Sequence, residues 1–204
     1  MVTILILAAG ASSRMRGQDK LVTQIDGKAL LRRVAESAVA TGSPILVTLP
    51  PAAMARRDVL QDLPLHIVEV PDAELGMSRS LVHAIKHVAD RGPTHQDGLM
   101  ILPGDMPGFT TDALARLIAR FQAAPHAILR GGSEAGDPGH PTIFPCDLWA
   151  ELSQVTGDEG GKSVLKRHSD RVEVVPLPGQ MATLDLDTPE DWAAYLGHPP
   201  VWSA

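Results

Sequence analysis

The sequence predicts a three-layer α/β/α fold with a mostly parallel, Rossmann-like sheet. Short apolar runs alternate with amphipathic segments as far as Gln122, and this alternation is typical of βαβ units. The run Val2–Leu7 is apolar throughout, as expected for a strand buried on both faces of a parallel sheet. A chain of 204 residues fits one such domain, so we expect a single domain over residues 1–204 with a flexible tail at 197–204.

In the first half of the chain, each element follows from periodicity and from the residues that end it. Pro50 and Pro51 stop the second apolar run, Gly42 ends the first amphipathic segment, and Thr110 caps the last one. Strands are expected at Val2–Leu7, Ile45–Leu49, 65–70 and 98–102. Helices are expected at 29–41, 54–60, 78–89 and 110–123.

The second half has shorter segments and more glycine and proline, above all between residues 131 and 141. Such a stretch often covers the edge of an open α/β sheet where ligands bind. Strands are expected at 127–129, 142–144 (an edge strand) and 171–175. Helices are expected at 148–155, 162–168 and Pro189–Leu196, the last with Thr188 as its cap and Pro189 in its first turn.

Composition excludes several classes of protein. The net charge of −6 argues against general nucleic-acid binding. No stretch approaches the roughly 20 apolar residues of a membrane helix, and the chain's start lacks the basic segment of a signal peptide. Cys146, the only cysteine, allows no intrachain disulfide, and we expect it to be a small buried apolar residue. We therefore expect a cytoplasmic protein without membrane or nucleic-acid partners.

The segment after the first strand has the composition of a phosphate-binding loop. It reads AAGASSRMRGQDK over residues 8–20. Small residues let the backbone approach a ligand, and Arg14 and Lys20 add positive charge suited to a triphosphate. The loop matches neither G-x-G-x-x-G nor the P-loop pattern. A near match at 157–163 has Thr156 in place of the first glycine and lies between helical segments, so we reject it as a P-loop.

Acidic residues at two further places supply candidate metal ligands. Asp105 follows the strand expected at 98–102, where a carboxylate would face a bound triphosphate, although it could instead cap the turn before Pro107. Asp185 and Asp187 project to the same side of an extended segment. Either could join Asp105 on a magnesium ion, and we favour Asp187. The same segment also begins the last helix.

These motifs resemble those of a known family. The pattern L-A-A-G-x-S-x-R-M-x-G-x-x-K over residues 7–20 resembles the signature of nucleotidyltransferases with a nucleotide-diphospho-sugar transferase (glycosyltransferase-A-like) fold. GMSRSL at 76–81, GHPTIF at 139–144 and GDEG at 157–160 resemble elements of the molybdenum cofactor cytidylyltransferases, within the MobA-like superfamily. The resemblance spans about residues 3–195. The chain departs from the family at Arg16, an extra residue, and at Gly104-Asp105-Met106-Pro107, where an acid-Gln-Pro is usual.

The resemblance implies a reaction and a set of roles. CMP would pass from CTP to the phosphate of a molybdenum-bound pterin with release of pyrophosphate, because Ala-Ala-Gly in the first loop goes with cytidine in that family. Arg14 and Lys20 would be catalytic, and Asp105 and Asp187 would bind Mg²⁺. The implied nucleotide-binding residues are Leu7, Ala8, Ala9, Gly10, Ser12, Ser13, Gly76, Met77, Ser78 and Ser80. The implied acceptor-binding residues are Gly139, His140, Pro141 and Asp158, and the product would go to a molybdoenzyme or its chaperone.

Alternatives remain open at several positions. Ser78 could cap a helix, Arg79 could contact the nucleotide or solvent, His140 could be a structural loop residue, and Asp158 could cap the following helix. The whole protein could be a related transferase that uses GTP or acts on a sugar phosphate or another phosphorylated small molecule. It could also be a nucleotide-binding partner protein without catalysis. The joint presence of Arg14, Lys20, Asp105 and Asp187 argues against that last hypothesis.

Overall fold

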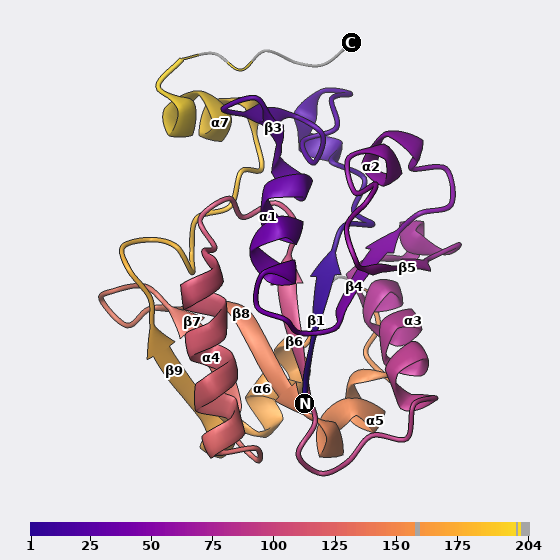
Figure 1. Cartoon of the computed structure of the whole chain (residues 1–204), viewed down its shortest axis with the longest axis vertical. Helices are drawn as coiled ribbons and strands as arrows, with labels where there is room; N and C mark the ends of the chain where they lie inside the picture. Colours follow the sequence, from indigo (N-terminus) through magenta and orange to yellow (C-terminus); the bar gives the residue numbers. More distant parts are fainter. Residues whose placement is uncertain (158–159, 199, 201–204) are drawn as a thin grey trace.

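A seven-stranded sheet forms the centre of the computed structural model, which describes residues 1–157, 160–198 and 200 (Figure 1). The strand order is β5-β4-β1-β6-β8-β7-β9. Only β8 runs antiparallel to its neighbours, so the predicted, mostly parallel sheet is confirmed. The strands are β1 Val2–Leu7, β4 Ile45–Leu49, β5 His66–Glu69, β6 Gly98–Pro103, β7 Ile128–Gly132, β8 Pro138–Pro145 and β9 Val172–Pro176.

Helices cover both faces of this sheet. One face carries α1 (Leu30–Val39) and α4 (Thr111–Ala123). The other carries α3 (Met77–Ala89), α5 (Trp149–Leu152) and α6 (Lys162–Arg167). Two further helices, α2 (Met54–Asp58) and α7 (Pro189–Leu196), lie towards the end of the molecule to which β1 points (Figure 1). The three layers follow the predicted architecture.

The continuous apolar character of β1 has a direct structural cause. Ile4 packs into the core beneath α1 and α4, whereas Leu5 packs into the core beneath α3 and α5. Successive side chains of a strand point to opposite faces, and both faces of this sheet are covered. Five of the six residues of this strand are accordingly apolar, and the sixth, Thr3, is a small β-branched residue that is only 5% exposed. Figure 1 shows β1 in the middle of the sheet.

Two of the predicted helix starts are confirmed and one is wrong. The Thr110 hydroxyl accepts a hydrogen bond from the Ala113 amide, and Thr188 forms a reciprocal capping box with Asp191. The α3 helix, however, is capped by Gly76 with φ 109°, so Ser78 lies within the helix instead of capping it. The left-handed backbone of Gly76 turns the chain before the helix, which is why the cap falls two residues earlier.

The predicted edge strand at 142–144 is wrong in both length and place. It is the central part of β8, which pairs with β6 on one side and β7 on the other. Pro141 lies outside the regular pairing, because the register with β7 shifts after Arg130. Proline cannot donate to a strand ladder, and here it occupies the irregular stretch. This irregularity concealed the full extent of the strand in the sequence.

Smaller differences have local causes. The hairpin of β2 (Gln24–Ile25) and β3 (Lys28–Ala29) was not predicted, although its Asp26-Gly27 turn has the usual positive φ angles of 52° and 75°. Instead of a helix over 148–155, a 3-10 turn leads into the four-residue α5. Cys146 is partly exposed instead of buried, and its thiol donates to the Thr94 carbonyl oxygen at 2.9 Å.

No helix in the described part of the chain is both long and apolar enough to cross a membrane. The expectation of a single domain over residues 1–204 stays a prediction, as does that of a flexible tail at 197–204, most of which lies outside the described residues.

Close backbone packing beside β8 gives the first testable prediction. A Cβ at Gly139 would lie 1.9 Å from the Ala182 carbonyl oxygen, whereas a Cβ at Gly10 would meet nothing within 4 Å. We expect Gly139→Ala to lower the free energy of unfolding by about 3 kcal/mol or more, because backbone must move. Gly10→Ala, the matched control, should change it by less than about 0.5 kcal/mol in urea denaturation. If Gly139→Ala and Gly10→Ala had the same free energy of unfolding, the close packing of Gly139 against Ala182 would be contradicted.

Candidate active site

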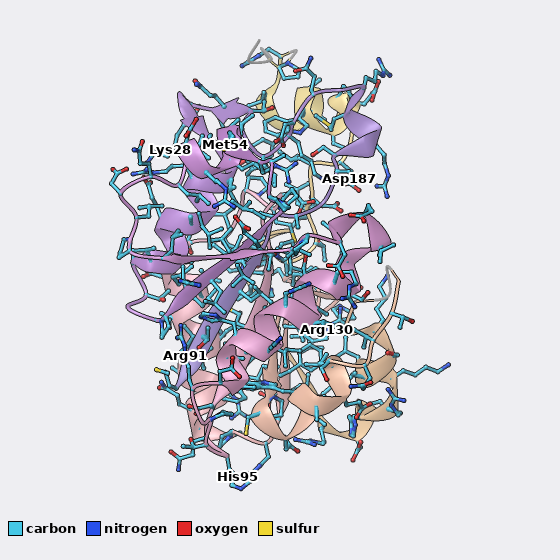
Figure 2. All side chains as sticks on the ribbon, turned by 90° about the vertical axis from the view of Figure 1, so that its right-hand side faces the viewer. Lys28, Met54, Arg91, His95, Arg130 and Asp187 are labelled. Atoms are coloured by element: carbon cyan, nitrogen blue, oxygen red, sulfur yellow. The ribbon has the colours of Figure 1, made fainter. Side chains whose placement is uncertain are left out.

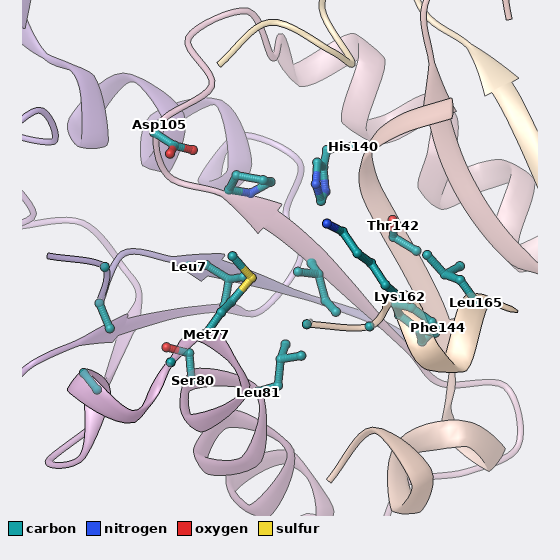
Figure 3. Close-up of a pocket in the computed structure, with 18 of the residues that line it drawn as sticks. Leu7, Met77, Ser80, Leu81, Asp105, His140, Thr142, Phe144, Lys162 and Leu165 are labelled. Carbon is teal, nitrogen blue, oxygen red and sulfur yellow. The ribbon is translucent and has the colours of Figure 1, made fainter. Parts of the chain in front are cut away.

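A cavity of about 590 Å³ opens at the carboxyl ends of β1 and β6 (Figure 3). The loop after β1 and the start of α3 form one side, and residues of β7, β8 and α6 form the other. The predicted site residues that line it are Leu7, Ala9, Gly10, Gly76, Met77, Ser80, Asp105 and His140. The predicted residues Ala8, Ser12, Arg14, Lys20, Ser78, Gly139, Pro141 and Asp187 are not among its lining. Asp158 and the side chain of Ser13 lie outside the described part of the structure.

Lys20 joins the two predicted metal ligands. Its ammonium donates to Asp105 at 2.7 Å and to Asp187 at 2.5 Å, and the residue is only 9% exposed. Burial acts to lower the pKa of Lys20, but the two carboxylates outweigh it and hold the pKa above its usual value. Arg14 forms a second ion pair with Asp187. The structure therefore brings together four residues that are far apart in the sequence.

Backbone hydrogen bonds hold these segments in place. The Gly104 amide donates to the Leu7 carbonyl oxygen at 3.0 Å, which ties the end of β6 to the end of β1. The Leu186 amide donates to the Asp105 carbonyl oxygen at 3.3 Å, which brings in the segment before α7. In the side view, Asp187 lies towards the end of the molecule that carries α7 (Figure 2). The two aspartates meet because of this backbone framework.

The sequence left open whether Asp185 or Asp187 joins Asp105. The structure pairs Asp187 with Lys20, and Lys20 with Asp105. For Asp185, burial raises the pKa, and the nearby Asp187 carboxylate raises it further. Of the two, it is therefore Asp187 that Lys20 joins to Asp105, and its role as the second metal ligand stays a prediction.

The residues present fit a divalent cation held partly by substrate. Two carboxylates converge on one ammonium, so they also converge on a point that a small cation could occupy. Within the described residues there is no group of three or more His, Cys, Asp or Glu side chains placed to hold a metal ion. Magnesium is commonly bound by one or two carboxylates together with substrate phosphates and water. The pair Asp105 and Asp187 matches that requirement.

Arg56 is a site residue that sequence reasoning missed. Its guanidinium, on α2, donates to the carbonyl oxygens of Ala8 at 2.6 Å and Gly10 at 2.9 Å, and to Asp19 at 2.7 Å. The residue is buried, with 6% of its surface exposed. Nothing in the pattern around Met54–Asp58 distinguishes Arg56 from its neighbour Arg57. The contact arises only when α2 packs beside the loop.

The extra residue of the loop, Arg16, has a structural explanation. Arg16 adopts a left-handed backbone with φ 52°, directly before Gly17 with φ 90°, and this pair of residues accommodates the insertion. Its side chain pairs with Glu190 at 2.9 Å, but both side chains are mostly exposed, so the pair contributes little to stability. Ser12 also has a left-handed backbone, and its buried hydroxyl has no hydrogen-bond partner among the described residues.

The start of α3 shows the surroundings of Ser78 and Arg79, for which the sequence left alternatives open. Ser78 is buried, and its amide donates to the Gly157 carbonyl oxygen at 3.0 Å, which ties α3 to the segment before α6. Arg79 is not free in solvent, because it pairs with Asp72 at 2.5 Å. Asp72 also contacts His83 at 2.9 Å. Met77 and Ser80 remain as the side chains of this helix start that face the cavity (Figure 3).

The Gly139-His140-Pro141 element has a mixed character. Gly139 packs against the backbone of Ala182, so its role in the structure is close packing. His140 lines the cavity, and its buried Nδ1 has no hydrogen-bond partner in the described structure. Burial lowers the pKa of His140, and the guanidinium of Arg130 lowers it further. His140 is therefore a neutral ring at the cavity wall near neutral pH.

Comparisons with known proteins show the family to which the chain belongs. A family model for the MobA-like NTP transferase domain matches residues 4–172. A molybdenum cofactor guanylyltransferase of Shewanella sp. (strain ANA-3) is 28% identical over 60% of this chain and 57% of its own length. A nicotine blue oxidoreductase of Paenarthrobacter nicotinovorans is 26% identical over 93% of both chains. The bifunctional protein GlmU of Koribacter versatilis is 29% identical over 95% of this chain but only 44% of its own length, so this chain spans less than half of that protein.

Solved structures show the same fold. The homologue of Mycobacterium tuberculosis Rv0371c from Mycobacterium sp. strain JC1 is 31% identical, with a TM-score of 0.81 over 96% of this chain and 95% of that chain. Rv0371c of M. tuberculosis in complex with manganese is 26% identical, with a TM-score of 0.72 over 96% and 97%. With its matching fold, its motif-bearing loop and a family match over most of its length, this chain belongs to the MobA-like NTP transferase domain family.

Proposed function

We propose that this protein is a divalent-metal-dependent cytidylyltransferase that transfers CMP from CTP to the phosphate of molybdenum-bound molybdopterin and releases pyrophosphate. The observation that carries the proposal is the convergence of Asp105 and Asp187 on Lys20, beside the loop of Ala8, Ala9 and Gly10. This arrangement supplies cations for a triphosphate and carboxylates for its metal ion.

Three findings support the finer parts of the proposal. The Ala8-Ala9-Gly10 sequence resembles the loop that goes with cytidine in the cytidylyltransferases. A relative of this chain is a molybdenum cofactor guanylyltransferase, which supports a pterin acceptor. A structural neighbour was solved with manganese, which supports a divalent metal ion, and we propose Mg²⁺ for this chain. A cytoplasmic location and delivery to a molybdoenzyme or its chaperone are part of the same proposal.

The reaction we propose is a substitution at the α-phosphorus of CTP. An oxygen of the acceptor phosphate attacks that phosphorus, a new P–O bond forms, and the bond to the bridging oxygen breaks, which releases pyrophosphate. The acceptor is already a phosphate anion, so no general base is needed. Such reactions depend mainly on positioning and on neutralising charge. Arg14 and Lys20 would stabilise the negative charge that builds up on the leaving pyrophosphate.

Asp105 and Asp187 would hold the metal ion, which supplies charge neutralisation for the triphosphate. In the structure Lys20 pairs with both carboxylates, and Arg14 pairs with Asp187. These two cations lie beside the proposed metal ligands, where they would bind phosphate oxygens of CTP, so that cations and carboxylates would each have a partner of opposite charge.

The proposed function is tested by measuring pyrophosphate release with CTP, GTP, UTP and ATP, each paired with molybdenum-bound molybdopterin or with a sugar phosphate as acceptor, in the presence of MgCl₂. We expect CTP to support release at least tenfold faster than the other three nucleotides. Release with GTP but not with CTP would show that the assignment of cytosine as the base is wrong. Release only with a sugar phosphate as acceptor would favour the related sugar-phosphate transferase, and no release with any pair would favour a nucleotide-binding protein without catalysis.

Removal of either carboxylate should abolish activity. We expect Asp105→Ala and Asp187→Ala to lower the rate of pyrophosphate release at least 100-fold, because one metal ligand is lost in each. Asp58→Ala removes an exposed carboxylate at the end of α2 and serves as the control. Circular dichroism should show that all three variants keep the fold. Full activity of Asp105→Ala would show that the metal assignment is wrong.

Arg56 should matter for nucleotide binding without touching the nucleotide. Its loss removes the donors that hold the Ala8 and Gly10 carbonyl groups, so we expect Arg56→Met to weaken CTP binding at least tenfold in calorimetry. Among the described residues the neighbouring Arg57 pairs with Glu69 and with no atom of the first loop, and Arg57→Met should stay within twofold of the wild type. If the two variants bound CTP equally well, Arg56 would have no positioning role.

A further inference from the structure

A second group of basic side chains lines the cavity on the side away from the first loop. Arg130 comes from β7, His140 from β8, and Lys162 from the first position of α6. Arg130 stands opposite Thr142 in the strand register, and both residues line the cavity. Figure 3 shows the Lys162 side chain extending towards the His140 ring. Three distant segments of the chain thus bring nitrogen atoms to one wall.

Arg130 lacks the partner that a half-buried cation normally has. Its Nε and Nη2 donate to the Gly139 carbonyl oxygen at 3.3 and 3.2 Å, which fixes the guanidinium in place. Among the described residues it forms no ion pair with a carboxylate, and burial lowers its pKa. The other Arg residues of the described chain that lack a carboxylate partner, Arg91 and Arg116, are exposed to solvent. Arg130 therefore remains able to bind an anion inside the cavity.

The surroundings of the His140 ring also carry more positive than negative charge. Burial lowers the pKa of its ring, and the cations Arg130 and Lys162 lower it further, whereas Asp105 acts to raise it. Its buried Nδ1 has no partner in the described structure. Lys162 likewise makes no hydrogen bond or ion pair with a described residue and is exposed at the cavity rim. This wall thus has two cations and an imidazole, with no described carboxylate paired to any of them.

We propose that Arg130, His140 and Lys162 bind the phosphate monoester of the acceptor substrate. The proposal rests on the proposed function and specifies where its second substrate binds. Arg14 and Lys20 supply the cations for the triphosphate on the side of the first loop, so a second cationic wall is free for a second phosphate. An acceptor phosphate held there faces the cavity that also contains Asp105, where the α-phosphorus would lie.

This wall also explains how two anions can approach each other. The acceptor phosphate and the triphosphate repel one another, and the guanidinium and ammonium groups offset that repulsion. Arginine and lysine bind phosphate oxygens through short, charge-assisted hydrogen bonds. The acceptor's oxygen then forms the new bond to the α-phosphorus as pyrophosphate leaves, while its other oxygens stay bound to these residues. Thr142 and Leu165, beside the cations, would contact the body of the acceptor.

The chain offers matched variants for a test. Lys162→Ala removes a cation from the cavity wall, and Lys166→Ala removes an exposed cation four residues further along the same stretch of helix. Arg130→Met and Arg116→Met form the corresponding arginine pair, with Arg116 exposed on α4. Because Lys162 and Lys166 are both exposed, their alanine variants should fold. The lysine pair therefore tests the phosphate site even if Arg130→Met fails to fold.

The experiment measures binding of inorganic phosphate and of phenyl phosphate to the full-length protein by calorimetry, without nucleotide or metal. We expect Lys162→Ala and Arg130→Met to weaken binding of both at least tenfold, and the two controls to stay within twofold of the wild type. Affinity for CTP with MnCl₂, measured separately, should stay within twofold in all four variants.

The outcomes separate this inference from the proposed function. Phosphate binding that is absent in the wild type, or unchanged in Lys162→Ala, would overturn the phosphate site. A parallel loss of CTP affinity in Lys162→Ala would assign the cations to the nucleotide and overturn it as well. If phosphate binding depends on Lys162 but CTP does not bind the wild type, the phosphate site stands and the proposed cytidylyltransfer fails.

Discussion

The contact of the Lys20 ammonium with Asp105 and Asp187 joins the first loop, the end of β6 and the segment before α7. Without a cation between them, two carboxylates this close would repel each other and separate the ends of β6 and the segment before α7. A nearly buried ion pair is costly to desolvate, and it is stable only when the geometry is good and the hydrogen bonds are made. The raised pKa of Lys20 shows that the carboxylates outweigh that cost.

Cations gather around the cavity although the chain as a whole is acidic. The chain has a net charge of −6, yet cations lie on both sides of Asp105: Arg14 and Lys20 on one, Arg130 and Lys162 on the other. The proposed reaction between two phosphates would need such a division, because each anion would have to be neutralised where it binds. The surrounding negative charge limits unspecific binding of the same cations to polyanions.

Periodicity predicted the parts of the fold whose environment is uniform. Val2–Leu7 and Ile45–Leu49 were predicted to the residue because each is apolar apart from one threonine, and every position in them is buried or nearly so. β8 was not, because prolines and the polar His140 interrupt its pattern where it leaves the regular ladder and borders the cavity. For the site, motifs indicated Lys20 and both aspartates, but Arg130 belongs to no motif and Lys162 only to the rejected P-loop match. Their common wall arises only from tertiary packing.

The support of the first loop by Arg56 shows why a loop of small residues needs a partner elsewhere. In a trans peptide the carbonyl group and the next amide point in opposite directions. Arg56 binds the carbonyl oxygens of Ala8 and Gly10, so the amides of Ala9 and Ala11 point away from it, and both residues line the cavity. One guanidinium thus orients two peptide groups before any ligand arrives. Small side chains let phosphate oxygens approach the backbone, and the buried cation makes that backbone present donors instead of acceptors.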